Sequence, residues 1–156
     1  MSYLSEWRKD KTKNNRGFTL IEIMLVVALI VAIGGISVPV YQAFQVRNNL
    51  DMAAYTITQM LRRAQVLAQS GEGDATWGVH IASGSATLFK GASFAGRDTT
   101  VDEISEISSD MVSSGVSEII FSKLLGEPQT TGNVVLTTSN NDTKTITINA
   151  KGTIEY

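Results

Sequence analysis

The hydrophobic pattern of the chain begins with one long apolar segment. Glu22 is the one charged residue between Phe18 and Phe44, and no charged side chain occurs between Ile23 and Val38. A helix over residues 18–44 would be about 40 Å long and can cross a hydrocarbon core of about 30 Å. A chain of 156 residues has little core in which to bury such a segment. The pattern therefore predicts a membrane-spanning helix.

The pattern then becomes amphipathic. Between Val46 and Ala68, apolar residues recur at steps of three and four, which predicts a helix with one apolar face. Gly71 is available for a left-handed C-terminal cap. The expected helix runs from Phe18 to Ser70 and is about 80 Å long.

A helix kink is expected within the apolar segment, at Gly34, Gly35 and Pro39. Proline lacks the amide hydrogen and clashes with the preceding turn, so it bends a helix. Each glycine weakens the helix by about 1 kcal/mol relative to alanine.

Beyond residue 74 the helical period gives way to short runs rich in Val, Ile and Thr. These runs predict strands at residues 76–81, 86–90, 118–121, 134–138, 144–149 and 153–155. Polar turns at 83–85 and 139–143 predict two β-hairpins. Residues 91–117 are expected to form a loop with at most one strand, near 101–107. The order predicts an α+β fold, in which the long helix packs on an antiparallel β-sheet head.

The charges divide the chain into three segments. Residues 1–17 carry five basic and two acidic groups, residues 18–46 carry only Glu22, and residues 47–156 carry eight basic and twelve acidic groups. The positive-inside rule places the basic segment in the cytoplasm and the remaining body outside. The acidic balance beyond residue 17 disfavours nucleic acid as a partner, because phosphate binding relies on Lys and Arg.

The N-terminal segment differs from a secretory signal peptide. Its apolar run is longer than the usual 7–15 residues, and the small residue Gly17 precedes that run instead of following it. Glu22 is unusual, since an acid in the bilayer costs on the order of 3 kcal/mol. It either extends to the headgroups, where its charge also suits the helix dipole, or it has a specific partner.

Residues 16–22, with the sequence RGFTLIE, resemble the signature of type IV pilins and type II secretion pseudopilins, which follows a class III prepilin leader. The resemblance covers residues 16–44. It implies that a membrane prepilin peptidase cleaves between Gly17 and Phe18, and that Phe18 is then N-methylated. Glu22 matches the acidic fifth position of the mature family sequence, which acts in assembly.

The resemblance also implies an organisation: a cleaved leader at 1–17, a transmembrane and filament-core helix at 18–44, and a soluble amphipathic helix with a β-sheet head at 45–156. The strand pattern is similar to the heads of H-type minor pseudopilins. The implied protein is no enzyme, but a structural subunit that assembles into a bacterial filament through its apolar helix. Its implied partners are the prepilin peptidase, identical or related subunits, an inner-membrane assembly platform and membrane lipid.

The implied location is the membrane, with the leader in the cytoplasm and the head outside, and then an extracellular or periplasmic filament. Two alternatives stay open. One is a minor pseudopilin of a type II secretion system, and the other is a filament-tip module that binds DNA or a surface.

Few residues suggest chemistry beyond assembly, and no cofactor or metal is expected. The chain has no cysteine, which excludes disulfides, thiolate metal sites and a cysteine nucleophile. His80 is interpreted as a structural residue of a strand. The acids in residues 98–110 are interpreted as a solvated loop, with calcium binding as the less favoured alternative. Asn141 begins a glycosylation sequon in an expected turn.

Overall fold

A computed structural model of the chain describes residues 17–156, with only the backbone described at 36–39. The residues divide into two units, the first ending at Val40 and the second comprising Tyr41–Tyr156. We call the second the head unit. The predicted leader, apart from Gly17, lies outside the described residues.

The predicted long helix is confirmed. Helix α1 (Leu20–Ser70) has 51 residues and begins two positions later than expected. It ends where Gly71 adopts a left-handed conformation with φ of 70°, which only glycine adopts without steric cost. The helix assignment continues through Gly34, Gly35 and Pro39, and the kink stays a prediction.

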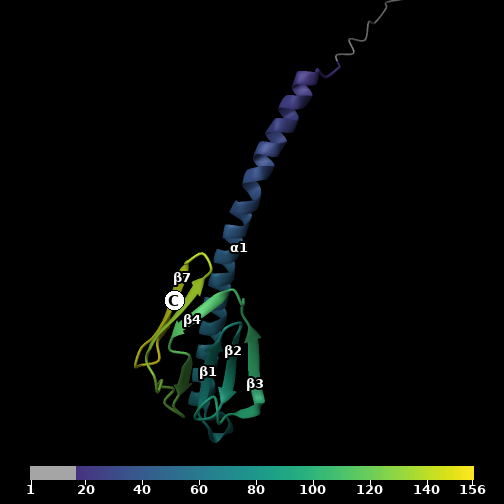
Figure 1. Ribbon diagram of the computed structural model, residues 1–156. Coiled ribbons are helices and arrows are strands. Elements are labelled where there is room, and N and C mark those ends of the chain that lie inside the picture. The colour runs from purple at the N-terminus through teal and green to yellow at the C-terminus, as the bar shows by residue number, and fades with distance from the viewer. Residues whose placement is uncertain (1–16) are drawn as a thin grey trace, which may run out of the picture. The chain divides into compact units, whose positions relative to one another are not determined.

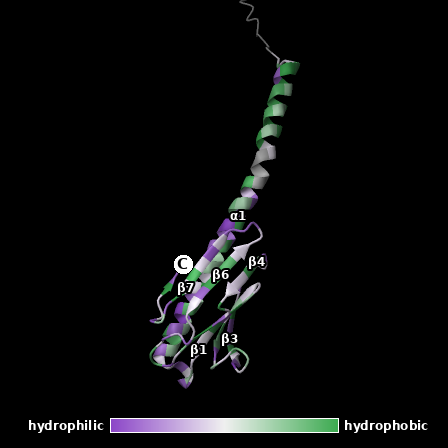
Figure 2. Ribbon diagram, turned by 60° about the vertical axis from the view of Figure 1, so that its left-hand side comes forward, coloured by the Kyte–Doolittle hydropathy of each residue, from purple (hydrophilic) through white to green (hydrophobic). Residues whose placement is uncertain are grey.

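The head unit contains a short 3-10 helix, Glu72–Asp74, and eight strands in two antiparallel sheets (Figures 1 and 2). The first sheet has the order β3-β2-β1-β5, and the second has the order β4-β6-β7-β8. The strands are β1 (Trp77–Ala82), β2 (Ser85–Lys90), β3 (Asp98–Glu106), β4 (Met111–Gly115), β5 (Glu118–Phe121), β6 (Gly132–Thr138), β7 (Thr143–Ile148) and β8 (Ile154–Glu155).

Both predicted hairpins are confirmed. Strands β1 and β2 pair across a two-residue turn, with Ala82 opposite Ser85, and Gly84 supplies the positive φ that this turn needs. Strands β6 and β7 pair with Thr137 opposite Thr143. The predicted strands at 118–121 and 153–155 correspond to β5 and β8.

One hydrophobic core joins α1 to both sheets. The apolar helix face predicted from the sequence is buried, and Ile57, Leu61 and Ala64 have no exposed surface. Strands β6 and β7 bury alternate residues on the face that meets this core, as a sheet with one solvated face does. The C-terminal part of α1 and both sheets therefore share one hydrophobic core and stabilise one another.

The expectation for residues 91–117 was right about a strand near residues 101–107, which is β3, but wrong about the number of strands. This segment contains two strands, β3 and β4, where a loop with at most one strand was expected. Strand β4 has the sequence MVSSG, which carries a weak strand signal, and it exists because Met111–Gly115 pair with Val134–Thr138 of β6. Its strand state therefore depends on a partner about twenty residues further along the chain.

Candidate functional site

The first turn of α1 holds a reciprocal cap between Thr19 and Glu22. The Glu22 amide donates to Thr19 Oγ1 at 3.3 Å, and the Thr19 amide donates to Glu22 Oε2 at 3.4 Å. Such a capping box satisfies two amide groups that a helix start otherwise leaves unpaired. Glu22 is thus a helix-capping residue in the uncleaved chain. The T-x-x-E spacing was visible in the sequence, but Thr19 was not identified from it.

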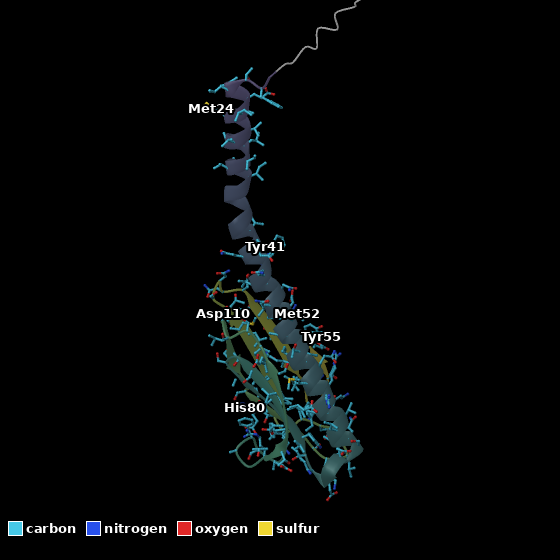
Figure 3. All side chains as sticks on the ribbon, turned by 90° about the vertical axis from the view of Figure 1, so that its right-hand side faces the viewer. Met24, Tyr41, Met52, Tyr55, His80 and Asp110 are labelled. Carbon is cyan, nitrogen blue, oxygen red and sulfur yellow. The ribbon has the colours of Figure 1, made fainter. Side chains whose placement is uncertain are left out.

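The helix that follows this cap exposes apolar side chains all round. Figure 2 shows the hydrophobic colour along this part of α1, and Figure 3 shows Met24 projecting away from it. Phe18, Ile21 and Ile30 are each more than three-fifths exposed. The segment is long and apolar enough to span a membrane. Since exposed apolar surface of this extent is unfavourable in water, it needs lipid or other apolar helices around it.

Gly17, Gly34 and Gly35 have open space where a side chain would stand. A Cβ built on any of the three meets no atom within 4 Å, apart from its own helix and chain neighbours. None of the three has the positive φ that requires glycine. Neither packing nor backbone conformation within the described residues therefore explains glycine at position 17.

His80 lies on β1 within an aromatic cluster. Its ring stacks on Phe94, and the guanidinium carbon of Arg97 lies 3.7 Å from the centroid of that Phe94 ring. Arg97 Nε also donates to Asp102 Oδ2 at 2.8 Å. Neither Phe94 nor Arg97 was predicted from the sequence, because residues 91–97 carry no periodic signal and acquire these contacts only when the segment folds over the sheet.

The acids of residues 98–110 lie mostly on a strand and do not converge. Asp102 and Glu103 are neighbours on β3, yet Asp102 pairs with Arg97 and Glu103 pairs with Arg63 of α1. Adjacent strand residues point to opposite faces of a sheet, which separates the two carboxylates. Within residues 17–156, no three His, Asp or Glu side chains are placed to hold a metal ion.

Two exposed acids have lowered pKa values. A hydrogen bond and charge attraction from Lys123 lower the pKa of the Asp74 carboxyl below its usual 3.8. Hydrogen bonds from the Thr100 hydroxyl and amide lower the pKa of Asp98.

Asn141 lies in the β6–β7 turn with a positive φ of 62°, as a turn asparagine often does.

Comparison with known proteins agrees with the helix and with the fold. Residues 12–38 match the family described as the prokaryotic N-terminal methylation motif. No curated protein sequence is significantly similar to the chain. Among solved structures, the chain is similar to the minor pseudopilin EpsH from the Type 2 Secretion System of Vibrio cholerae, with a TM-score of 0.51 and 11% sequence identity. The similarity covers 69% of this chain and 94% of that chain.

The chain joins a pilin-type N-terminus to a pseudopilin fold. The predicted resemblance to type IV pilins and pseudopilins is confirmed at both levels, by the methylation motif and by the fold of the head. The α+β class with a long N-terminal helix is confirmed as well. The chain thus carries the N-terminal methylation motif, and its fold is similar to that of a minor pseudopilin.

Proposed function

We propose that this pilin-like chain is cleaved between Gly17 and Phe18 by a prepilin peptidase, methylated on the Phe18 amine, and assembled into a filament. The observation that carries the proposal is the exposed apolar half of α1, which begins at the Thr19–Glu22 cap and overlaps the methylation motif matched at residues 12–38. Before assembly, lipid would surround this helix. In the filament, the same helices of neighbouring subunits would surround it.

The glycine at position 17 supports the cleavage step. No contact or backbone angle in the described residues requires glycine there. A protease, in contrast, gains from a residue without a side chain, because an extended backbone then enters a narrow active-site cleft. The basic residues that precede Gly17 would hold the cleavage site on the cytoplasmic side, with the head unit outside.

Cleavage gives Glu22 a second role besides capping. It creates an ammonium group on Phe18, and this group and the Glu22 carboxylate are both costly to bury in an apolar filament core. We propose that Glu22 of an incoming subunit pairs with the Phe18 amine of its neighbour and so sets the axial register. Removing one partner of a buried ion pair typically costs about 3–5 kcal/mol, which is enough to stop subunit addition.

Substitutions at Glu22 separate capping from charge pairing. Glu22→Gln keeps a side chain that can complete the capping box but removes the charge, whereas Glu22→Ala removes both. We expect both variants to be inserted and cleaved but to assemble poorly, and Glu22→Asp to keep some function. The measurement is the amount of filament sheared from cells, with cleavage checked by intact mass. Wild-type assembly by Glu22→Gln would show that Glu22 acts as a cap only.

A minor pseudopilin of a type II secretion system is the second candidate. The fold of the head unit favours it, because EpsH is a minor pseudopilin and 94% of its chain is covered. Deletion of the gene distinguishes the two roles. Loss of protein secretion with few copies of the chain per cell would favour the pseudopilin, and loss of surface filaments would favour a pilus subunit. In either role the chain would contact the inner-membrane assembly platform.

A further inference from the structure

Strand β3 is the exposed edge of the first sheet. It has nine residues, the most of any strand among residues 17–156, and within the sheet it pairs with β2 alone. Alternate residues of an edge strand direct their backbone N–H and C=O groups away from the sheet. These groups can pair with an added strand from another chain.

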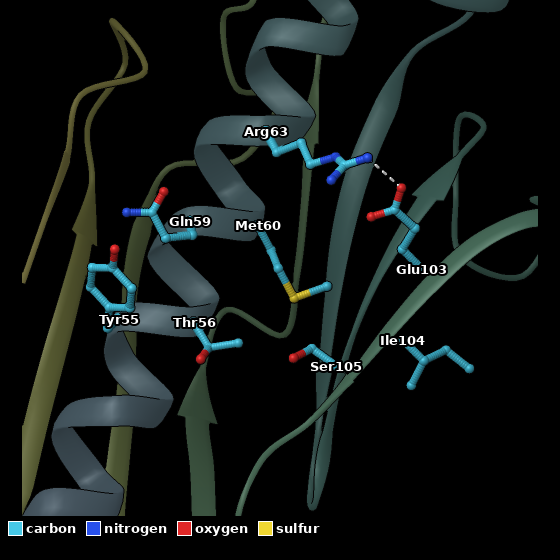
Figure 4. Close-up of a pocket in the computed structure, with 8 residues that line it drawn as sticks. All are labelled: Tyr55, Thr56, Gln59, Met60, Arg63, Glu103, Ile104 and Ser105. Atoms are coloured by element: carbon cyan, nitrogen blue, oxygen red, sulfur yellow. Dashed lines mark hydrogen bonds and ion pairs between the residues drawn. The ribbon is translucent and has the colours of Figure 1, made fainter.

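An open groove runs beside this edge, between β3 and α1 (Figure 4). It has a volume of about 450 Å³ and is lined by Tyr55, Gln59, Met60 and Arg63 of α1 and by Glu103 and Ser105 of β3. Met60 and Arg63 extend from the helix on the side of Glu103 in Figure 4, and Arg63 Nη2 donates to Glu103 Oε1 at 2.6 Å.

The groove continues past the Arg63–Glu103 ion pair toward the C-terminal end of β3. A second hollow of about 210 Å³ shares Thr56 with the first and extends to Glu106. Apolar side chains line and flank both hollows, since Met52, Tyr55 and Ile104 are each at least half exposed. An added strand therefore gains apolar contacts as well as backbone hydrogen bonds.

The charge of the edge selects the kind of strand that can be added. Residues 98–110 contain five acids and no basic residue. Arg97 and Arg63 neutralise Asp102 and Glu103, but the exposed carboxylates of Glu106 and Asp110 form no ion pair among residues 17–156. Like charges placed opposite each other destabilise paired strands, so two copies of this chain pair poorly through β3.

We propose that the free edge of β3, with the groove beside it, binds an extended segment of another protein that carries lysine or arginine on alternate residues. The backbone groups of β3 supply the pairing, and Met52 and Tyr55 supply apolar contact. The acids attract strands that carry basic residues and repel acidic strands. This inference goes beyond assembly through α1, and its test needs no filament.

The test uses the full chain in an uncharged detergent and a capped nine-residue peptide, KTKTKTKTK, matched in length to β3. Two control peptides replace its lysines by glutamate (ETETETETE) or its threonines by proline (KPKPKPKPK). The lysine–proline peptide keeps the charge but lacks the amide hydrogens that strand addition needs. We expect binding of the first peptide alone, with a dissociation constant below about 1 mM, and slower hydrogen exchange at residues 98–106.

Charge reversal on the chain tests the assignment to β3. Glu106→Lys should weaken binding of the lysine–threonine peptide roughly fivefold at low salt, and Glu155→Lys on the edge strand β8 should leave it unchanged. Three outcomes overturn the proposal: no binding, equal binding of the lysine–proline peptide, or equal effects of the two reversals. Protection, in the free chain, of the β3 amides that point away from β2 would also overturn it, because a second copy would then occupy the edge.

Discussion

The imidazole ring of His80 stacks on the ring of Phe94, with centroids 3.9 Å apart and planes inclined by 11°. His80 belongs to β1, and Phe94 belongs to the segment between β2 and β3, so the stack holds this segment against the sheet. The Phe94 ring also meets Phe89 edge-on at 5.5 Å, and the Phe94 amide donates to Glu118 Oε1 at 2.7 Å. The segment at residues 91–97 thereby covers the sheet face that does not meet α1.

Removing the Phe94 ring should therefore destabilise the head unit. We expect Phe94→Ala to lower the free energy of unfolding by about 2 kcal/mol, less than for a fully buried phenylalanine because Phe94 is half-buried. Urea unfolding of the detergent-solubilised chain, followed by Trp fluorescence, measures the change. Ala95→Ser in the same segment should have little effect. A wild-type midpoint for Phe94→Ala would mean that residues 91–97 contribute nothing to stability.

Thr58 carries a buried hydroxyl that has no hydrogen-bond partner, and its side chain is fully buried in α1. Valine has nearly the same shape and removes the unpaired oxygen, so Thr58→Val should stabilise the head unit by about 1 kcal/mol. Thr56→Val, at a partly exposed position of the same helix, is the matched control. If Thr58→Val unfolded at a lower urea concentration than wild type, the hydroxyl would have a partner after all.

The ion pair of Asp74 and Lys123 should make stability depend on pH. Because the folded pKa of Asp74 lies below its usual 3.8, the pair stabilises the native state above that value. The stabilisation is lost as the pH falls through the folded pKa. Asp74→Asn should thus lower stability slightly at about pH 7 and match wild type at about pH 2. Glu72→Gln, in the same 3-10 helix, should show no such pH-dependent difference.

Cleavage after position 17 should depend on glycine. Gly17→Leu should leave the full-length precursor in the membrane, because a bulky side chain blocks entry of the backbone into the peptidase cleft. Intact-mass analysis of the membrane-bound chain measures this. Gly35→Leu places the same side chain in open space further along α1 and should be cleaved normally. Normal cleavage of the Gly17→Leu variant would contradict the proposed recognition of Gly17 by a prepilin peptidase.

Residues 45–156 should fold as a soluble α+β monomer without the apolar half of α1. The buried helix residues, from Leu50 to Ala68, all lie within this fragment together with both sheets. Circular dichroism and gel filtration test the expectation. A well-folded fragment with an all-helical spectrum would contradict it.

The predicted elements that the structure confirms have strong local signals. Residues 46–68 repeat at the helical period, and the runs around Gly84 and Asn141 combine alternating β-branched residues with a turn. Strand β4 and residues 91–97 lack such signals. Met111–Gly115 become a strand by pairing with β6, and Phe94 becomes a packing residue by reaching His80. Neither contact can be inferred from the residues next to it.

The sequence by itself determined the apolar segment, the junction from Arg16 to Glu22 and the helix–strand order, because hydrophobic period and turn chemistry act over a few residues. Only the tertiary structure decided the division into two sheets that share one helix. It also left β3 as a free acidic edge beside a groove. Strand partners are selected by the burial of side-chain faces between segments that are far apart in the chain. The free energy of this burial is gained only when those segments come into contact.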